Sequence, residues 1–292
     1  MTIQTIGVVG AGSMGTGIAN LAAINGFNVI LRDIEERFLD NAIQRMDQFM
    51  AKSVAKGKMT EEQKLETLGR IITTTNLEAM AEADVVIEAV IENMDLKKEV
   101  FSELDRIVPE GVILATNTSS MSITEIAAAT KRPENVAGMH FFNPAQLMKL
   151  VEVVRGFKTS DETVEMLKAL SKNLSKEPVE VKKDSPGFIV NRIMVPQFIE
   201  AIKLLEEGVA SAEDIDKAVT LGLNYPMGPF TLQDFAGVDI GYHVMNYFKE
   251  EFNSDQYAPP MLLKQLMRAG RFGKKSGAGF YDYEQEKGGI YQ

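Results

Sequence analysis

Cysteine is absent from the 292-residue chain, and histidine occurs only twice. Without cysteine the chain cannot form a disulfide framework, a thiolate metal site or a cysteine nucleophile. The two histidines do not stand at an HExxH-type spacing, so the sequence also argues against a zinc site. We therefore expect a protein that works without a bound metal.

Positive charge and long apolar runs are also scarce. The chain has 31 basic residues against 41 acidic ones, and its net charge of −10 argues against nucleic-acid binding through phosphate contacts. No apolar run approaches the roughly 20 residues that a membrane span needs. The N-terminus lacks the basic segment of a signal peptide and enters a strand pattern directly. We expect a cytoplasmic protein with no nucleic-acid or membrane partner.

What the chain does contain, in its first part, is an alternation of strand-like and helix-like segments. A β-branched run at residues 3–9 is followed by a helix pattern at 13–25 and by a second strand pattern at 27–31. This order predicts an α/β fold with a doubly wound, mostly parallel sheet of the Rossmann type. Because both faces of such a sheet are covered, its strands are continuous apolar runs. Further strands of this kind are expected at residues 70–74, 84–89, 112–116, 136–141 and 150–154.

A helical hairpin is expected directly after the second strand. Residues 35–55 are strongly helical by residue type. Thr60 and Gln63 then form a capping-box pattern that opens another helix. The two helices together would occupy about residues 35–69.

A break between two domains is expected at Pro186-Gly187, since this pair ends the alternating pattern. Beyond it the pattern is helical to about Arg268. The length of the chain suits two ordinary domains. We expect an α/β domain over residues 1–184 and a smaller all-α domain over residues 185–292.

The segment Gly10-Ala-Gly12-Ser-Met-Gly15 matches the GxGxxG pattern, and it follows one predicted strand and opens a helix. Gly10 would allow the tight turn, Gly12 would let a pyrophosphate approach the backbone, and Gly15 would let helix and strand pack closely. The helix N-terminus would add unpaired amides and a positive dipole end. The motif predicts a dinucleotide site but leaves FAD and NAD open, and its alternative is a glycine-rich turn without a ligand.

Asp33 stands at the end of the second predicted strand, at the distance after the motif where an acidic residue is expected. A carboxylate there accepts hydrogen bonds from both hydroxyls of an adenosine ribose and repels a 2′-phosphate. This preference favours NAD over NADP. Arg32 beside it is a residue type that accommodates such a phosphate, so NADP stays the less favoured cofactor.

His140 and Glu152 are lone polar residues in apolar surroundings. His140 lies at the C-terminal end of a predicted strand, where doubly wound folds bind their ligands. Glu152 lies within the next apolar run, where a buried carboxylate needs a cationic or hydrogen-bonding partner. A pair of the two would fix the imidazole tautomer, and the ring could take a proton from an alcohol or return one to a ketone. The alternative is a core histidine capped by a carbonyl, with Glu152 at a solvated sheet edge.

Other polar residues near predicted strand ends allow both a functional and a structural interpretation. The segment 117–120, Asn-Thr-Ser-Ser, could reach a nicotinamide, a ribose or a substrate oxygen, but its pattern favours an ordinary turn or helix cap. Glu92 and Lys97 resemble a solvated helix start with an ion pair. His243, on a helix face, is expected to be structural.

Five motifs, in order, resemble the 3-hydroxyacyl-CoA dehydrogenase family. They are N-T-S-S at 117–120, H-F-F-N-P with M-K-L-V-E-V at 140–153, P-G-F-I-V-N-R at 186–192, Y-P-M-G-P at 225–229 and F-G-K-K-S-G-A-G-F at 272–280. The similarity runs from about residue 3 to residue 283 and is strongest to short bacterial members that act on 3-hydroxybutyryl-CoA. The segment after Tyr283 has no counterpart in the family and is predicted to be disordered.

The resemblance implies a role for each residue of a site. His140 would be the general base and acid, and Glu152 would orient it. Ser119 and Asn191 would hold the substrate and preorganise the site. The contacts to NAD would come from Gly10, Gly12, Gly15, Asp33, Glu92, Lys97, Ser119, Asn143 and Lys275.

The resemblance also implies the partners. The helical hairpin would contact coenzyme A, and its lysines Lys52, Lys56 and Lys58 could meet the CoA phosphates. Gly57 stands at or beside the place of the family's own CoA lysine, which is a departure from the family pattern. The C-terminal helical domain would cover the cleft and form a homodimer.

The implied activity is the NAD-dependent interconversion of an L-3-hydroxyacyl-CoA, of four carbons in the acyl chain, and the 3-ketoacyl-CoA. One alternative is a lysine-dependent β-hydroxyacid dehydrogenase that acts on free acids. It would need a catalytic lysine early in the C-terminal helices, where the chain has Asn191 and Arg192. Another alternative is an NAD-binding structural or sensor protein without chemistry.

Overall fold

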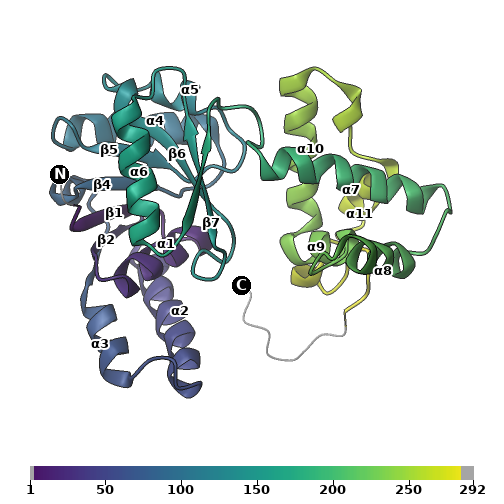
Figure 1. Cartoon of the computed structure of the whole chain (residues 1–292), viewed down its shortest axis with the longest axis horizontal. Helices are drawn as coiled ribbons and strands as arrows, with labels where there is room; N and C mark the ends of the chain where they lie inside the picture. The colour runs from purple at the N-terminus through teal and green to yellow at the C-terminus, as the bar shows by residue number, and fades with distance from the viewer. Residues whose placement is uncertain (1–2, 284–292) are drawn as a thin grey trace. The chain divides into compact units, whose positions relative to one another are not determined.

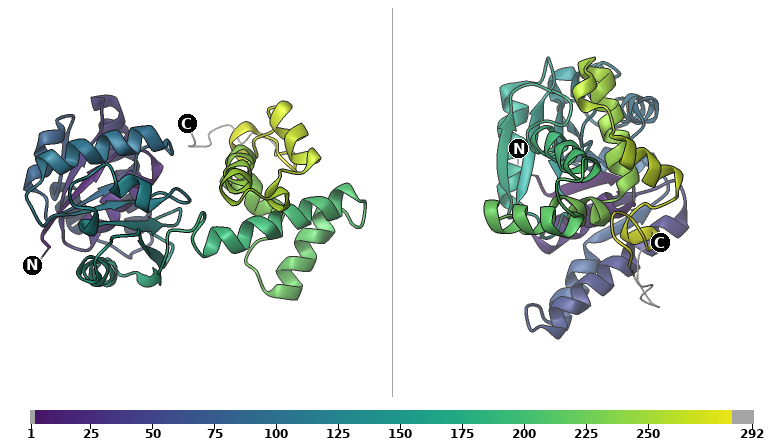
Figure 2. Two further views of the ribbon diagram at one scale, coloured as in Figure 1. Left: turned by 90° about the horizontal axis from the view of Figure 1, so that it is seen from above. Right: turned by 90° about the vertical axis from the view of Figure 1, so that its right-hand side faces the viewer.

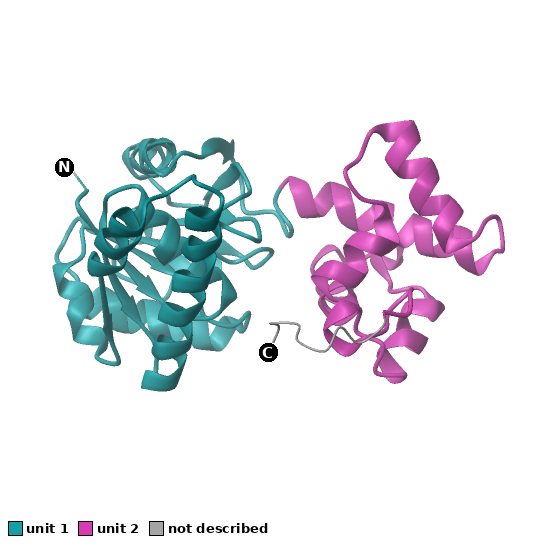
Figure 3. Ribbon diagram, turned by 90° about the horizontal axis from the view of Figure 1, so that it is seen from below, with its two compact units in different colours: residues 1–188 teal, residues 189–292 magenta. Residues whose placement is uncertain are grey.

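Residues 3–283 are described by a computed structural model, in which a strand-and-helix region is followed by a helical one (Figure 1). The chain divides into two compact units, residues 1–188 and residues 189–292 (Figure 3). The division falls beside Pro186-Gly187, the pair at which the sequence indicates a break. The tail after Tyr283, for which the sequence predicts disorder, lies outside the described residues.

The first unit is built on one eight-stranded sheet with the strand order β3-β2-β1-β4-β5-β6-β7-β8. Strands β1 to β6 are parallel, β7 is antiparallel to β6, and β8 is parallel to β7. The fold is thus the mostly parallel, doubly wound sheet that the sequence predicts. The strands are β1 (Thr5–Val9), β2 (Asn28–Arg32), β3 (Ile71–Thr74), β4 (Val85–Glu88), β5 (Ile113–Thr116), β6 (Val136–Phe141), β7 (Leu150–Arg155) and β8 (Glu177–Val181).

Strand β8 is not among the strands expected from the sequence. Its residues, E-P-V-E-V, alternate polar and apolar side chains and include Pro178. The strand forms an edge of the sheet, and proline is tolerated at an edge because its missing amide faces away from the ladder. The pattern of a buried strand therefore does not find it.

Helices cover both faces of the sheet and form two hydrophobic cores. Side chains of α1, α2 and α6 pack on one face, and those of α4, α5 and the short helix η1 pack on the other. Neighbouring residues of one strand, such as Val8 and Val9, therefore enter different cores, which explains the continuous apolar runs. The helices are α1 (Ser13–Ile24), α2 (Glu36–Ala55), α3 (Glu61–Gly69), η1 (Leu77–Glu82), α4 (Met94–Ile107), α5 (Ile123–Ala127), η2 (Pro133–Asn135) and α6 (Asp161–Asn173).

Helices α2 and α3 lie side by side and extend beyond the sheet (Figure 2). The capping box predicted from Thr60 and Gln63 is confirmed, with the Thr60 side chain bonded to the Gln63 amide and the Gln63 side chain bonded back to the Thr60 amide. Gly57, in the turn between the helices, has a φ of +67°. Because other residues rarely adopt this left-handed conformation, the turn favours a glycine at this position.

The second unit is entirely helical within its described residues. Its core gathers large buried side chains such as Ile202, Phe230 and Phe248. A search of the described residues finds no helix with both the length and the apolar character to cross a membrane. The helices are α7 (Val190–Glu206), α8 (Ala212–Leu223), α9 (Pro229–Ala236), α10 (Val238–Phe252), η3 (Asp255–Tyr257), α11 (Met261–Arg268) and η4 (Lys274–Ser276).

Two buried aspartates fasten the last described segment of the chain to these helices. Asp216 accepts hydrogen bonds from two amides at the start of α9 and from the hydroxyl of Tyr281. Asp234 accepts bonds from two later amides and from the hydroxyl of Tyr283. Burial, followed by the hydrogen bond to a carboxylate, raises the pKa of Tyr281 and of Tyr283. Both tyrosines are therefore held as neutral donors.

Candidate active site

The candidate site lies at the C-terminal edge of the parallel strands. Strand β1 has β2 on one side and β4 on the other, so the chain changes direction across the sheet at this point. In doubly wound folds a ligand binds in the crevice outside such a reversal. The segments that follow β1, β4, β5 and β6 all begin at this edge. They carry seven of the site residues that the sequence indicates: Gly10, Gly12, Gly15, Glu92, Lys97, Ser119 and Asn143.

The glycine motif forms the turn from β1 to α1 with the close approaches that its pattern predicts. Gly10 has a φ of +106°, and a side chain built on it would lie 2.6 Å from the carbonyl oxygen of Ala89. A Cβ on Gly15 would lie 1.8 Å from the carbonyl oxygen of Gly10. A Cβ on Gly12, in contrast, would meet nothing within 4 Å. The turn therefore needs two of the glycines for its own packing and leaves open space beside the third, at the start of α1, which fits a bound pyrophosphate.

Asp33 follows the end of β2 and is held against this turn. Its Oδ2 accepts a hydrogen bond of 2.6 Å from the amide of Ala11, and its Oδ1 accepts one of 2.7 Å from the amide of Ile34. The neighbouring Arg32 donates from Nε to the carbonyl oxygen of Thr75 at 3.3 Å. Because Asp33 is hydrogen-bonded to the glycine turn, the carboxylate and the turn can both contact the same ligand. This arrangement fits the adenosine half of a dinucleotide.

His140 and Glu152 form the side-chain pair that the sequence predicts. They are direct cross-strand neighbours in the antiparallel ladder of β6 and β7, and His140 Nδ1 lies 2.8 Å from Glu152 Oε2. The rings of Phe142 and Phe188 pack at 4.4 and 5.6 Å from the imidazole. Glu152 is fully buried between β6 and β8, so the alternative of a solvated sheet edge is wrong. With Nδ1 engaged by the carboxylate, Nε2 is the nitrogen that can exchange a proton with a ligand.

The segment after β5 is a turn with a link to each neighbouring strand. Thr118 Oγ1 accepts hydrogen bonds from the amides two and three residues on, which is the ordinary turn that its pattern favours. Asn117 Oδ1 accepts a bond of 2.9 Å from the amide of Phe141, beside His140. Ser119 donates from its amide and its hydroxyl to Glu92 Oε1. The turn thus joins the end of β6 to the segment after β4.

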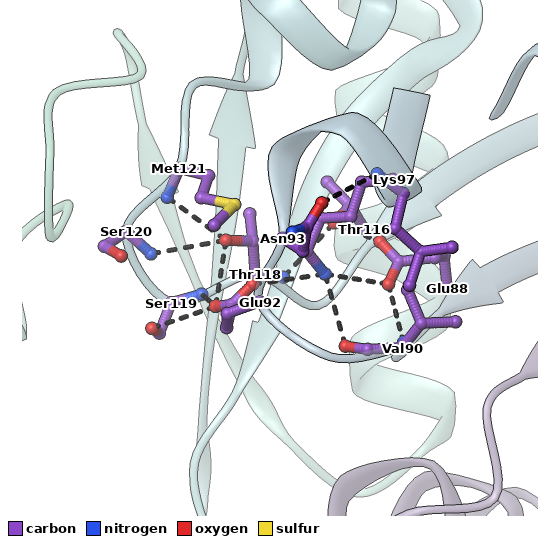
Figure 4. Close-up of polar contacts among 11 residues, drawn as sticks. Glu88, Val90, Glu92, Asn93, Lys97, Thr116, Thr118, Ser119, Ser120 and Met121 are labelled. Carbon is purple, nitrogen blue, oxygen red and sulfur yellow. Dashed lines mark hydrogen bonds and ion pairs between the residues drawn. The ribbon is translucent and has the colours of Figure 1, made fainter. Parts of the chain in front are cut away.

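Glu92 and Lys97 form an ion pair, but their surroundings differ from the expected solvated helix start (Figure 4). The Lys97 side chain is 1% exposed, and its Nζ lies 2.8 Å from Glu88 and 3.1 Å from Glu92. Only Glu92, 42% exposed, faces solvent. The expectation is wrong for Lys97 because a second carboxylate, Glu88, receives its ammonium group inside the protein.

Glu88 is the residue of this cluster that the sequence analysis misses. A signal for it exists, since the run V-V-I-E ends in one carboxylate after three apolar residues. It is the same type of signal that singles out Glu152. The run predicts a buried strand, and in the structure its last residue is fully buried as well.

The remaining predicted residues lie elsewhere in the two units. Asn143 is exposed just after β6, and Lys52 and Lys56 are exposed at the end of α2. Asn191 and Lys275 belong to the second unit, which is described by itself. The structure therefore brings together only the predicted residues that the first unit holds at the sheet edge. Asn191 lies in the first turn of α7, Lys275 forms an ion pair of 2.7 Å with Asp239, and His243 is exposed on α10.

The sheet order and the glycine turn define a dinucleotide-binding α/β protein. The family described as 3-hydroxyacyl-CoA dehydrogenase matches nearly the whole of it, with the NAD binding domain over residues 5–185 and the C-terminal domain over residues 187–283. The chain belongs to the 3-hydroxyacyl-CoA dehydrogenase family.

Individual relatives share most of their length with this chain. A probable 3-hydroxybutyryl-CoA dehydrogenase of Bacillus subtilis is 47% identical over 98% of this chain and 99% of its own. A 3-hydroxybutyryl-CoA dehydrogenase of Clostridioides difficile is 45% identical, over 96% and 99%. The crystal structure of (S)-3-hydroxybutyryl-CoA dehydrogenase from Ralstonia eutropha has a TM-score of 0.93 at 44% identity and covers 97% of this chain and 100% of its own.

Proposed function

We propose that the protein interconverts (S)-3-hydroxybutyryl-CoA and acetoacetyl-CoA with NAD, and that His140 and Glu152 act together as its general acid and base. The observation that carries this proposal is the 2.8 Å contact between His140 Nδ1 and Glu152 Oε2 at the end of β6. The four-carbon chain and the handedness at C3 are taken from the relatives named above, whose names state them.

In the proposed mechanism Gly10, Gly12, Gly15 and Asp33 hold NAD at the start of α1. The bound dinucleotide would supply the hydride-transfer chemistry of its nicotinamide ring, to or from C3 of the acyl chain. His140 Nε2 takes the proton of the 3-hydroxyl during oxidation and returns it to the 3-oxygen during reduction. Glu152 keeps the proton of the neutral ring on Nδ1 and stabilises the protonated ring by its charge.

The other assignments rest on the family resemblance. Ser119 and Asn191 would hold the substrate, and Lys52 and Lys56 would face the CoA phosphates. The remaining NAD contacts would come from Glu92, Lys97, Asn143 and Lys275.

An assay of nicotinamide oxidation tests the proposed function directly. Acetoacetyl-CoA and longer 3-ketoacyl-CoA substrates would be compared, each with NADH and with NADPH. We expect the highest kcat/KM for acetoacetyl-CoA with NADH. Turnover of free 3-keto acids instead would support the lysine-dependent alternative, and NADH binding without any turnover would support the non-catalytic one.

Replacing Asp33 with alanine should weaken NADH binding by roughly 10–100-fold, because a charged hydrogen bond to the ribose is lost. NADPH should lose less, since the same change removes the repulsion of its 2′-phosphate. The chain has no tryptophan, so titrations can follow the fluorescence of the reduced nicotinamide itself. Asp40→Ala, an exposed change in α2, is the control. Equal losses for both cofactors would mean that Asp33 does not contact the ribose.

The proposal extends to a homodimer formed through the second unit. Helices α7 and α8 line an apolar cavity of about 530 Å³, and Ile193, Leu221 and Leu223 along them are more than half exposed. Exposed apolar groups gathered in this way are typical of protein interfaces. A second copy of the same face would cover them, as the resemblance implies.

Replacing Ile193 with aspartate should shift the protein from dimer to monomer, because the change places a charge in a desolvated interface. Sedimentation velocity over a range of concentrations measures the shift. Phe157→Asp alters a side chain of the first unit that is 86% exposed, and this control should stay dimeric. A monomeric wild type, or an Ile193→Asp variant that stays dimeric, contradicts an interface at this face.

A further inference from the structure

Glu88 is a buried carboxylate whose two oxygens are both engaged (Figure 4). Its Oε1 accepts hydrogen bonds from Lys97 Nζ at 2.8 Å and from the amide of Val90 at 2.7 Å. Its Oε2 accepts a bond of 2.7 Å from the hydroxyl of Thr116 on the neighbouring strand β5. Glu88 therefore ties together the end of β4, the end of β5 and the first turn of α4.

The ammonium group of Lys97 depends on this carboxylate. Lys97 lies in the first turn of α4, where the helix dipole disfavours a positive charge. It is almost fully buried, and its ammonium group contacts Glu88, Glu92 and the carbonyl oxygen of Val90, the last at 3.5 Å. Glu88 offers the shorter of the two ion pairs and is the fully buried partner. Without it the ammonium would keep one carboxylate that is 42% exposed.

The network leads from the sheet interior to the candidate site. Glu92 Oε2 pairs with Lys97, while Glu92 Oε1 accepts bonds from the Ser119 amide at 2.7 Å and from the Thr118 hydroxyl at 3.0 Å. The segment 89–93 that carries Glu92 also borders the glycine turn, because the carbonyl of Ala89 lies where a side chain on Gly10 would be. Glu88 thus anchors a segment that touches both the dinucleotide turn and the Ser119 turn.

The stability of the core gives no reason for this arrangement. Burying two charges costs desolvation that their attraction roughly offsets, and well-packed apolar residues of similar volume are often at least as stable. A buried pair at the edge of a ligand crevice is better explained by the geometry that it imposes. Lys97 is drawn inward by Glu88, and Glu92 is then held by Lys97 beside the Ser119 turn.

We propose that Glu88 is a positioning residue of the cofactor site: through Lys97 it fixes Glu92 and the segment 89–93 where a bound dinucleotide meets the sheet edge. The inference rests on the proposed function only in that the ligand is taken to be NAD. It concerns binding geometry and is independent of which substrate is reduced.

A double-mutant cycle tests the proposal with Glu88→Gln, Lys97→Met and the two combined, in the full chain. The glutamine keeps the volume of Glu88 but removes the negative charge that faces the ammonium. Glu88→Gln and Lys97→Met should each weaken NADH binding by roughly tenfold or more. The combined variant should bind no more weakly than Lys97→Met alone, because Glu88 acts through Lys97. The measurements are NADH fluorescence titration, the KM for NADH against kcat, and the melting temperature.

Glu125→Gln is the matched control. It removes an exposed ion pair between Glu125 and Lys98, a residue of the same helix α4 as Lys97. Its NADH affinity should equal that of the wild type. Thr116→Val keeps the shape of the strand and removes the bond to Glu88, together with the bond that the Thr118 amide donates to the same hydroxyl. We expect a few-fold weaker NADH binding even if Glu88→Gln does not fold. The proposal is overturned if the losses of NADH affinity in Glu88→Gln and Lys97→Met add up in the combined variant. It is also overturned if Glu88→Gln lowers the melting temperature and leaves the NADH affinity unchanged. Unchanged NADH affinity in a folded Thr116→Val variant also overturns it.

Failure of the proposed function has a different signature. A wild-type protein that binds NADH but turns over no 3-ketoacyl-CoA would contradict the proposed reaction. The double-mutant cycle, measured on NADH affinity, would in that case still support the positioning role of Glu88. If the wild-type protein turns over the substrate and Glu88→Gln binds NADH with unaltered affinity, only the proposed role of Glu88 is contradicted.

Discussion

Replacing His140 with alanine is expected to lower kcat by roughly 10²–10⁴-fold while NADH still binds. The change removes the group proposed to exchange a proton with the 3-oxygen. It leaves untouched the glycine turn between β1 and α1 and Asp33, which directly follows β2. The measurement is the rate of NADH oxidation with saturating acetoacetyl-CoA, together with an NADH titration of the same preparation.

The other histidine of the chain supplies the control for this result. His243 is exposed on α10, beside the ring of Tyr242, and His243→Ala should keep the wild-type rate. Because the His140 side chain is 5% exposed, its variant needs a melting curve to establish that it is folded. A folded His140→Ala protein with wild-type turnover would remove the proton carrier from the proposed mechanism.

Replacing Glu152 with glutamine is expected to lower kcat by roughly 10²-fold or more, as other orienting carboxylates of catalytic histidines do. Glutamine keeps the volume of the buried side chain, but its amide can donate to Nδ1 and so place the ring proton on Nε2. The protonated ring also loses the nearby negative charge. The measurement is kcat for acetoacetyl-CoA reduction, together with an NADH titration and a melting curve of the same preparation.

Glu177→Gln makes the same change of charge on the neighbouring strand β8, at an exposed position. It should leave kcat unaltered. A folded Glu152→Gln protein with the wild-type kcat would make the carboxylate a packing residue of β7, and the proposed pairing of roles would fail.

Much of the candidate site could be predicted from single residues that break a local pattern. Gly10 and Gly15 stand where the strand pattern gives way to the helix pattern. In the structure both positions have the close backbone approaches that only glycine permits. His140 and Glu152 are each alone in an apolar run, and a buried charge of that kind requires a partner. Their contact was predictable because each was the best available partner for the other.

Other parts of the site were beyond local patterns. Glu92 and Lys97 have the spacing of an ordinary exposed helix start, and nothing near them in the sequence states that Lys97 is buried. Its burial depends on Glu88, nine residues before it, and on Thr116, which is joined to Glu88 across 28 residues of chain. Such contacts exist only after β4 and β5 have paired.

By itself the sequence determined the doubly wound sheet, the glycine turn, the helical second part and the histidine–glutamate pair proposed for the acid–base step. These features follow from the periodicity of the apolar residues and from the free-energy cost of burying an unpaired polar group. Both signals can be recognised within a few residues of sequence. Only the tertiary structure decided that β7 and β8 run opposite to the other strands, that Lys97 is buried, and that Glu88 anchors it. The reason is physical: strand register and direction set which distant side chains meet, and the charge state and burial of each depend on that meeting.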